Sequence, residues 1–506
     1  MVVQLACGAL HGVDAYRVDL EVDYSRQGMP SFVMVGLAEG AVREARERVF
    51  KALQNSGFKL PPARITVNLA PADRRKEGSA YDLPLALGLL AAAGVMPAEV
   101  LEGWFSAAEL SLDGRLKPVP GVLPLALLAR NEKARGLLVA PDNAGEAAVV
   151  EGLPVFSAHT LGEAVAFLMG HAELKAAVPP SPENAEEFLF DFADVKGQER
   201  AKRAMEIAAA GAHNILLIGP PGSGKTMLAR RMPGILPPLD FEEALEVTKI
   251  YSVARLLSGH GLMTRRPFRT PHHSDSSVSV IGGGVPPHPG EVSLAHHGVL
   301  FLDELPEFQR QALEVLRQPL EQGTVSISRA TYSITYPADF MLVAAMNPCP
   351  CGYSTDPRHT CTCSAQAVAR YRSRLSGPLL DRIDLHVEVP AVSYEDLRAA
   401  RSGPSSAEIR ERVQRAREVQ SARYRGTGCR TNASLSGVLL EEHCRLGREE
   451  HEFLGNAVES LALSARAYTR ILRVARTIAD LEGSASITLP HVAEALSCRM
   501  LDREQA

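Results

Sequence analysis

The sequence lacks an excess of positive charge. Its 54 Lys and Arg residues are outnumbered by 59 Asp and Glu residues, so the 506-residue chain carries a formal charge of -5. Proteins that bind nucleic acid over much of their surface are usually strongly basic. Any nucleic-acid contact must therefore be made by a local patch.

The sequence also lacks a long hydrophobic run. The most apolar stretch, residues 83–96, is too short to cross a bilayer, and its Ala and Gly content is typical of a packed core helix. The first residues, Met1 to Gln4, do not resemble the start of a signal peptide. We therefore expect a cytoplasmic protein with no membrane partner.

Cysteine is scarce, with eight residues in the chain, which argues against a disulfide scaffold. Half of them form one cluster: Cys349, Cys351, Cys361 and Cys363. Four thiolates suit a tetrahedral Zn²⁺ ion, so the cluster predicts a structural zinc site. The C-x-C spacing is tighter than the usual C-x2-C spacing, so free thiols, or His359 in place of one cysteine, are the alternatives.

The chain is long enough for about two to four domains. Changes in composition and pattern predict a first domain at 1–176, a stiff proline-rich linker at 177–190, a core at 191–392 and a helical segment at 393–506. In the first domain, strands at 18–23 and 64–69 and helices at 43–55 and 81–94 indicate an α+β fold. Helices in the last segment are expected at 406–423, 464–481 and 489–500.

The most informative stretch runs Gly219, Pro220, Pro221, Gly222, Ser223, Gly224, Lys225, Thr226. It follows the apolar run 215–218 and precedes a helix-like segment, which is the order strand, glycine-rich turn, helix. In that setting the backbone N–H groups and the helix N-terminus bind phosphate, Lys225 reaches the β- and γ-phosphates, and the Thr226 hydroxyl coordinates Mg²⁺. The pattern predicts an ATP site in an α/β core.

Two further strands supply the remaining polar groups of such a site. The apolar run 298–302 ends in Asp303 and Glu304, and the run 340–346 ends in Asn347. Asp303 is expected to hold the Mg²⁺ shell and Glu304 to deprotonate the attacking water. Asn347 would position that water. A simple turn role before Pro348 is the alternative for Asn347.

Several motifs resemble those of the magnesium-chelatase-related AAA+ ATPases: Arg269 to His273, the glycines at 282–284, and residues 289–296 before the strand that ends in Asp303. More narrowly, residues 345–352 and 464–468 resemble the ComM subfamily, also called YifB. The resemblance covers essentially the whole chain. It implies an AAA+ core with a helical C-terminal lid, and a hexameric ring of such subunits. It also implies that the ring uses ATP to move single-stranded and branched DNA, when incoming strands recombine during natural transformation.

The resemblance also carries over two arginines. Arg382 corresponds to the arginine finger, which is expected to reach the γ-phosphate in a neighbouring subunit, and Arg466 corresponds to the second sensor. A surface ion pair with Asp381 or Asp384 is the alternative for Arg382. Three other arginines on the same helix compete with Arg466 for its role: Arg470, Arg473 and Arg476.

The first domain resembles the proteolytic domain of the Lon proteases. There the nucleophilic serine lies in a Lys-Asp-Gly-Pro-Ser-Ala-Gly run, and in the matching stretch here, 76–82, Ala80 falls on the serine. The partner lysine falls near Leu123 or Pro124, neither of which can act as a base. We therefore expect the catalytic dyad to be absent and the domain to act as a scaffold or a guide for DNA.

DNA contacts are expected at a predicted hairpin, 324–334, with Arg329 near its tip, and around Arg265, Arg266 and Arg269. Residues 398–430 hold nine arginines against three acids, although a solvated helix face explains that run equally well. Two other functional classes stay open: a metal-chelatase motor subunit and a protein-remodelling ATPase. The Lon-like domain and the four-cysteine loop favour the DNA motor.

Overall fold

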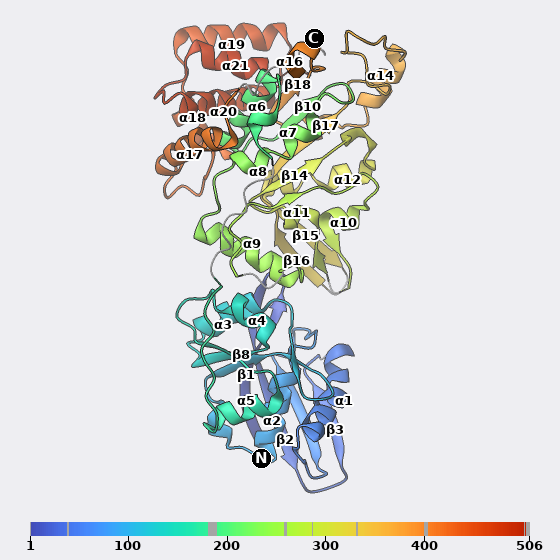
Figure 1. The fold of residues 1–506 in the computed structure, drawn as a ribbon, viewed down its shortest axis with the longest axis vertical. Helices are drawn as coiled ribbons and strands as arrows, with labels where there is room; N and C mark the ends of the chain where they lie inside the picture. The colour runs from blue at the N-terminus through green and yellow to red at the C-terminus, as the bar shows by residue number, and fades with distance from the viewer. Residues whose placement is uncertain are drawn as a thin grey trace. The chain divides into compact units, whose positions relative to one another are not determined.

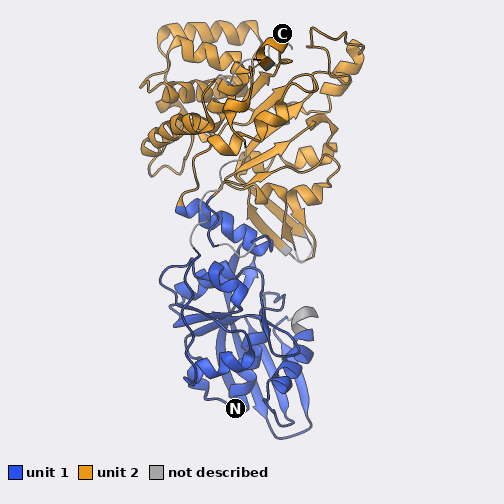
Figure 2. Ribbon diagram, in the orientation of Figure 1, with its two compact units in different colours: residues 1–185, 241–264 blue, residues 186–240, 265–506 orange. Residues whose placement is uncertain are grey.

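The structure, a computed structural model, describes residues 2–37, 40–180, 190–257, 261–285, 287–329, 332–398, 403–499 and 501. The chain divides into two units (Figure 2): residues 1–185 and 241–264 form unit 1, and residues 186–240 and 265–506 form unit 2. Most of the predicted linker at 177–190 lies outside the described residues.

Unit 1 contains two sheets and a short hairpin (Figure 1). The larger sheet has the order β1-β2-β4-β3, in which only β3 and β4 run parallel, and the smaller parallel sheet has the order β5-β8-β9. The strands are β1 (Val2–His11), β2 (Asp14–Ser25), β3 (Ser31–Val35), β4 (Arg64–Ala70), β5 (Trp104–Ala107), β6 (Glu109–Leu110), β7 (Leu116–Lys117), β8 (Gly136–Val139) and β9 (Val155–Ser157).

The helices of unit 1 include every helix that the sequence predicts for the first domain. They are α1 (Gly40–Asn55), α2 (Asp82–Ala92), the 3-10 helix η1 (Ala98–Leu101), α3 (Val122–Asn131), α4 (Pro141–Ala147), α5 (Leu161–Leu168) and α9 (Phe241–Val253). Every residue of α2 is buried, because the helix packs against β1 and β2 on one side and α1 on the other. The predicted α+β character of the first domain is confirmed.

Helix α9 belongs to unit 1 although the sequence places it inside the predicted 191–392 core. The hydroxyl of Ser252 and the backbone N–H of Leu123 both donate to the buried carboxylate of Glu146. Leu245 packs against the apolar cluster of α3 and β8, and Lys249 Nζ lies 2.6 Å from Asp14 Oδ1. The chain thus returns to unit 1 after entering unit 2.

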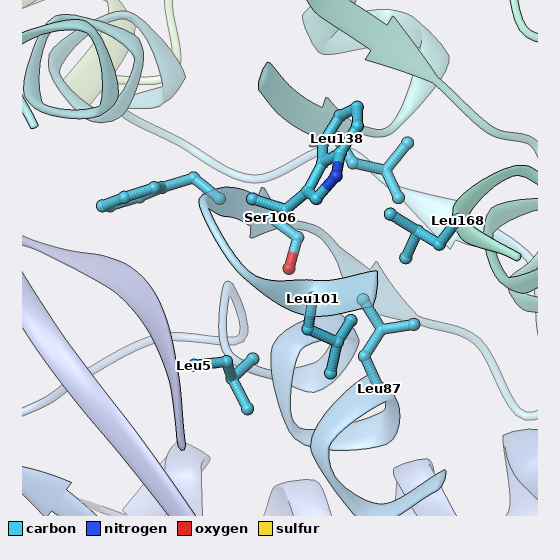
Figure 3. Close-up of a pocket in the computed structure, with 8 residues that line it drawn as sticks. Leu5, Leu87, Leu101, Ser106, Leu138 and Leu168 are labelled. Carbon is cyan, nitrogen blue, oxygen red and sulfur yellow. The ribbon is translucent and has the colours of Figure 1, made fainter. Parts of the chain in front are cut away.

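The positions that match the Lon dyad are apolar in this fold. Leu123 lies in the buried cluster of α3, and Ala80 packs against that same cluster. Within the described ranges no hydrogen bond joins Ser79 to Lys117, the two nearest polar candidates in sequence. A small cavity of about 10 Å³, with room for about one water molecule, lies elsewhere in unit 1. Its lining includes Leu5, Leu87, Leu101 and Leu138 (Figure 3).

Unit 2 is built on a five-stranded sheet with the order β11-β14-β17-β10-β18, in which all pairs are parallel. Its strands are β10 (Ile215–Ile218), β11 (Phe268–Arg269), β14 (Val299–Leu302), β17 (Met341–Met346) and β18 (Leu385–Glu388). The central strands β10, β14 and β17 are buried along their whole length, as expected for a parallel sheet covered on both faces. The predicted α/β core is confirmed.

Two hairpins extend from this core: β12 (Gly282–Gly283) with β13 (His288–Pro289), and β15 (Thr324–Arg329) with β16 (Tyr332–Pro337). The helices of the core are η2 (Phe192–Asp194), α6 (Glu199–Gly211), α7 (Lys225–Ala229), α8 (Met232–Ile235), α10 (Ser277–Ile281), α11 (Glu291–Leu294), η3 (Leu305–Glu307), α12 (Arg310–Val315), α13 (Pro319–Gln322), α14 (Ala365–Arg372), α15 (Gly377–Leu380) and α16 (Tyr394–Arg398).

The C-terminal segment is helical, as predicted (Figure 1). It contains α17 (Ser406–Arg423), η4 (Asn432–Ser434), α18 (Gly437–His443), α19 (Arg448–Ser460), α20 (Ala465–Leu481) and α21 (Leu489–Ser497). Helix α17 has the predicted bounds, and α20 begins after its N-cap, Ser464. None of the helices in the described ranges has the length and apolar character that a bilayer crossing requires.

Candidate nucleotide and metal sites

Three neighbouring strands of unit 2 end at the same edge of the sheet. In the parallel register Ile218 of β10 lies opposite Met346 of β17, and Leu302 of β14 lies opposite Ala344 of β17. The residues that follow these ends are the glycine-rich loop, Asp303 and Asn347. Ligand sites of parallel sheets form at this edge. The structure therefore brings the three predicted parts of the nucleotide site together.

The glycine-rich loop, residues 219–224, leads directly into α7. Gly224 precedes this helix with φ of 96°, a left-handed conformation that glycine adopts without steric cost. Lys225 Nζ donates to the carbonyl oxygens of Gly219 and Pro220 at 2.7 and 3.0 Å, and to Asn347 Oδ1 at 3.1 Å. The ammonium group is thus held over the loop by three acceptors, where it can transfer its hydrogen bonds to phosphate.

Burial lowers the pKa of Lys225 below its usual value, although the carboxylates of Asp303 and Glu304 act in the opposite direction. A buried ammonium group gains more from a bound anion than an exposed one, because it has already lost most of its water. The electrostatics of this lysine therefore favour a phosphate group above the loop.

Thr226 and Asp303 are in direct contact. The Thr226 hydroxyl donates to Asp303 Oδ2 at 2.7 Å, and the N–H of Glu304 donates to Asp303 Oδ1 at 2.9 Å. A hydroxyl and a carboxylate beside a phosphate loop are the oxygen ligands that Mg²⁺ takes in such sites. The donor set of these two residues fits the Mg²⁺ ion that the sequence predicts.

Glu304 lies next to His273, the last residue of the motif at Arg269 to His273. His273 Nδ1 is 3.6 Å from Glu304 Oε2. The imidazole is fixed by His272, whose ring centroid is 4.1 Å away, and by the edge of Phe308 at 6.4 Å. His273 follows strand β11, the neighbour of β14 in the sheet, which explains why it reaches the carboxylate.

The two predicted catalytic arginines lie together, at contacts that do not include the phosphate loop. Arg382 donates through Nη1 to the carbonyl of Pro378 at 2.6 Å and pairs through Nη2 with Glu321 of α13. Arg466 is largely exposed and pairs with Asp381, the residue before Arg382, at 3.2 Å. The predicted alternative partners of Arg382, Asp381 and Asp384, are thus bound by other residues.

Two of the three competing arginines of helix α20, Arg470 and Arg476, are engaged in buried contacts, whereas the buried Nε of Arg473 has no hydrogen-bond partner among the described residues. Arg470 Nη1 lies 2.7 Å from Asp384 Oδ1. Arg476 pairs with Asp480 and donates to the carbonyl oxygens of Ser484 and Ala485. Arg466, with 64% of its side chain exposed, differs from Arg470 and Arg476 in that its guanidinium is available for a ligand at the surface.

Two of the predicted DNA-binding arginines have structural partners. Arg266 donates to the carbonyl oxygens of Pro237 and His297, both at 2.7 Å. Arg269 forms a two-point pair with Glu291 at 2.7 and 2.8 Å. Arg265 is exposed. Arg329 ends strand β15, and its side chain lies outside the described residues.

The arginine-rich run at 398–430 is also used within unit 2. Arg412 Nε lies 2.5 Å from Glu206, Arg417 donates to the carbonyl of Ala209 at 2.9 Å, and Arg423 forms a two-point pair with Asp480. These contacts attach α17 to α6 and α20. These three arginines therefore have a structural role, which differs from both the predicted DNA contact and the predicted solvated helix face.

The four predicted zinc ligands converge between β17 and α14. The Sγ atoms of Cys349, Cys351 and Cys361 are 3.4 to 3.7 Å apart, and all four thiols lie within 4.8 Å of one another. A tetrahedron with Zn–S bonds of about 2.3 Å has S···S edges of about 3.8 Å. Backbone N–H donors at Tyr353 and Thr362 lower the pKa of Cys351 to about 6, which favours the thiolate. The arrangement fits a tetrahedral zinc ion.

The other candidate ligand, His359, has a different role in the structure. Its Nδ1 lies 3.0 Å from Asp356 Oδ2, and its ring stacks on Tyr353 with centroids 4.7 Å apart. The same aspartate accepts from the backbone N–H of Arg358 at 2.9 Å. These contacts close the loop between the two C-x-C pairs.

The sequence does not predict the contacts that three residues make near the site. Gln198 has φ of 62° and donates through Nε2 to the carbonyls of Ser223, in the phosphate loop, and Pro390. Glu321 binds Arg382, and His273 faces Glu304. Their partners are distant along the chain, so only the folded sheet reveals them.

Comparison with known proteins gives three family matches. The model described as magnesium chelatase, subunit ChlI, matches residues 191–397. That of the ChlI C-terminal region matches 403–499, and a further model, described as subunit ChlI of Mg-chelatase, matches 20–143. The three matches thus include both units.

Similar curated proteins extend over nearly the whole chain. Competence protein ComM of Haemophilus influenzae is 48% identical over 497 residues, covering 97% of this chain and 96% of the relative. The uncharacterized protein YifB of Escherichia coli is 46% identical over 495 residues, with 97% and 96% covered. The magnesium-chelatase 67 kDa subunit of Chlorobaculum parvum is 29% identical over 162 residues, which are 32% of this chain and 24% of that protein.

Proposed function

Because the chain belongs to the ComM/YifB family of magnesium-chelatase-related AAA+ ATPases, we propose that it forms a hexameric ring in which ATP hydrolysis moves single-stranded and branched DNA. As a helicase it would promote branch migration in homologous recombination during natural transformation. The observation that carries the ATPase part is the meeting of three strand ends around Lys225, Asp303 and Asn347. The name of the relative, competence protein, supports the link to DNA uptake.

In the proposed reaction, Thr226 and Asp303 would hold a Mg²⁺ ion, which would supply positive charge beside the phosphates. Lys225 moves its hydrogen bonds from the loop carbonyls to the phosphates. Glu304 accepts the proton of the attacking water, which Asn347 orients. Each of these tasks falls to a side chain at the sheet edge.

A neighbouring subunit supplies the positive charge that stabilises the phosphoryl group during its transfer. Arg382 binds Pro378 and Glu321 in its own chain, and within the described ranges it makes no hydrogen bond to its own phosphate loop. A guanidinium supplied in trans stabilises the transition state of phosphoryl transfer. In a ring, Arg382 and the adjacent Arg466 would provide it, so hydrolysis would take place at subunit interfaces.

DNA movement is assigned to the β15–β16 hairpin (Figure 1). One face is apolar and buried, with Ile327 and Ile334 paired across the strands, and Tyr336 donates to the carbonyl of Pro287 at 2.8 Å. The opposite face is an exposed row of hydroxyls, on which Ser326 and Thr335 lie 3.0 Å apart. Hydroxyl groups are common donors to phosphate in nucleic-acid complexes.

The proposal includes one structural zinc ion on the four cysteines and a cytoplasmic site of action, where DNA recombines. Of the predicted DNA-binding arginines, Arg329 and Arg265 are retained as contacts. Arg266 and Arg269 are instead given a structural role, because they bind the carbonyl of Pro237 and the carboxylate of Glu291 within unit 2.

The second candidate function is a metal-chelatase motor subunit. It is favoured by the family match at 191–397 and by the partial similarity to a magnesium-chelatase 67 kDa subunit. The two candidates share the ATP site and differ in what the ring acts on. They are therefore separated by the effector that stimulates hydrolysis.

The direct experiment measures ATP turnover at low salt with single-stranded, duplex and four-way DNA, and with no addition. The DNA motor is expected to be stimulated several-fold by single-stranded or four-way DNA, with a steep loss of stimulation as salt rises. ATPase activity that no DNA alters would contradict the DNA assignment and favour the chelatase or protein-remodelling alternative. An absence of any ATP turnover would contradict the ATPase assignment itself.

A further inference from the structure

The four-cysteine loop touches the phosphate loop. Gly352, which directly follows Cys351, is buried and has φ of 88°. A Cβ atom at this position would lie 2.6 Å from Pro221 Cδ and 3.9 Å from Asn347 Cγ. The backbone of the cysteine loop is therefore in van der Waals contact with the glycine-rich loop, beside the side chain that binds Lys225.

The position of Gly352 is set by the cysteines around it. Its N–H donates to the carbonyl of Cys349 at 3.0 Å, which closes a tight turn between the two residues. The N–H of Cys351, the residue before Gly352, donates to the sulfur of Cys363 at 3.4 Å. Fixing the sulfur atoms of Cys349 and Cys351 thus fixes the turn that presents Gly352 to Pro221.

We infer that the four-cysteine loop is a wall of the nucleotide site, and that metal bound to its thiols holds the glycine-rich loop in its phosphate-binding shape. The inference rests on the proposed function, since it takes the ATP site and the zinc site as given. It assigns Gly352 a positioning role: the residue acts on phosphate through Pro221 and through the Asn347–Lys225 hydrogen bond.

The contact between position 352 and Pro221 is so close that only glycine fits at position 352. The pyrrolidine ring of Pro221 is rigid and cannot rotate away from an added methyl group. A substitution Gly352→Ala must therefore displace one loop from the other. Because overpacking of such contacts is costly, we expect the Kd for Mg·ADP to rise by about 5- to 100-fold in this variant, while the four cysteines still bind zinc.

A matched control separates this contact from backbone strain. Gly483 also has a left-handed backbone, with φ of 69°, and a Cβ there meets nothing within 4 Å. Gly483→Ala imposes the same kind of strain without a clash, so it should leave the Kd for Mg·ADP unchanged. The double variant Pro221→Ala/Gly352→Ala removes the obstructing ring atoms, and it should bind Mg·ADP more tightly than Gly352→Ala.

A second measurement on the unmodified protein needs no folded variant. If metal on the cysteines favours nucleotide binding, nucleotide must favour metal binding by the same factor. Titration with a chromophoric zinc chelator, with and without saturating Mg·ADP, should show several-fold tighter zinc retention when Mg·ADP is bound. Zinc content is measured in every protein sample by elemental analysis.

The outcomes are distinct. Three results together would support the inference. Gly352→Ala would bind Mg·ADP more weakly while it retains zinc, the double variant would regain affinity for Mg·ADP, and wild type would bind zinc more tightly when Mg·ADP is present. Any one of three results would overturn the inference. Wild type and Gly352→Ala would have equal Kd values for Mg·ADP, or Gly352→Ala and Gly483→Ala would lose the same affinity for Mg·ADP, or the zinc affinity would be the same with and without nucleotide. Wild-type protein that binds zinc but no nucleotide would contradict the proposed ATPase function instead.

Discussion

Glu304 has a left-handed backbone conformation, with φ of 51°. Outside glycine this conformation costs about 1–2 kcal/mol, so neighbouring contacts must hold it. Its N–H donates to Asp303 Oδ1 at 2.9 Å, and His273 Nδ1 lies 3.6 Å from its carboxylate. Strain at a polar residue beside a phosphate loop is typical of functional sites.

The role of Glu304 can be tested by one substitution. Glu304→Gln removes the base and keeps the side-chain shape, so ATP turnover should fall by about 100-fold or more, while nucleotide binding persists through Lys225 and Asp303. The measurement is steady-state phosphate release beside a nucleotide-binding titration. Glu307→Gln is the matched control, because that nearby glutamate pairs with Arg374 at 2.8 Å. Near-normal turnover in Glu304→Gln would exclude Glu304 as the base.

At the scale of single residues, the sequence predicts the site residues that directly follow strand ends. It does not predict the site residues that other segments of the chain bring to these strands. Lys225, Asp303 and Asn347 could be placed because parallel strands end at one edge. His273 and Glu321 could not, since their partners, Glu304 and Arg382, are set by the packing of separate segments. No spacing rule connects them.

Among the elements, β18 and the lid helix α20 are joined by a buried polar network. Asp384 lies 3.2 Å from His213 Nδ1 and 2.7 Å from Arg470 Nη1, and His213 Nε2 is 2.7 Å from the hydroxyl of Thr477. Burial alone would raise the pKa of Asp384, but His213 and Arg470 hold it well below the usual value. The ionised carboxylate therefore fastens the lid to the core.

Removing this charge should destabilise unit 2. Asp384→Asn leaves Arg470 buried without its partner, which typically costs about 3–5 kcal/mol. Asp381→Asn, which breaks the more exposed pair with Arg466, is the control and should cost less than about 1 kcal/mol. Urea unfolding monitored through unit 2 compares the two. Equal small shifts would show that the network does not fasten the lid.

The pH dependence of that difference follows from the depressed pKa of Asp384. A carboxylate whose pKa is lower in the folded state contributes stability above its unfolded pKa, about 3.9, and loses it as the pH falls towards the folded value. The difference in the free energy of unfolding between wild type and Asp384→Asn should therefore have its full size at neutral pH. It should shrink only in acid, below about pH 4.

The β15–β16 hairpin is the element assigned to DNA. Arg329→Ala should keep basal ATPase activity, because none of the described hairpin residues contacts the phosphate loop, and should lose most DNA stimulation. Arg448→Ala removes a charge from α19 whose side chain is 91% exposed, and it should retain stimulation. Titrations with four-way DNA at several salt concentrations compare the two. Full stimulation in Arg329→Ala would remove this residue from the DNA contact.

Element boundaries could be predicted where local chemistry decides them. Helix α17 begins at the predicted Ser406 because Ser405 and Glu408 form a capping box. The sequence could not predict that α9 belongs to unit 1. The buried face of α9 includes Val247 and Ile250. Apolar residues on one face indicate that the helix packs against another part of the protein, but they do not indicate which unit. The predicted helix at 489–500 ends earlier, at Ser497, and Met500 lies outside the described residues.

For the molecule as a whole, the account requires that each ATP site be completed by a neighbouring subunit. Arg382→Ala and Lys225→Ala should each be inactive alone, for lack of the finger and of the phosphate ligand respectively. Mixed together they should regain part of the wild-type turnover, because a ring then contains interfaces with both residues intact. Turnover of the mixture is measured at fixed total protein. Failure of the mixture to regain activity would show that Arg382 does not act in trans.

We propose that ATP hydrolysis drives this protein along branched DNA. The most direct measurement is resolution of a fluorescently labelled four-way junction into two duplexes, at low salt, with wild type and Glu304→Gln in parallel. The account predicts ATP-dependent resolution by wild type, no resolution with a non-hydrolysable analogue, and junction binding without resolution by Glu304→Gln. An active wild-type ATPase that neither binds nor resolves the junction would contradict it.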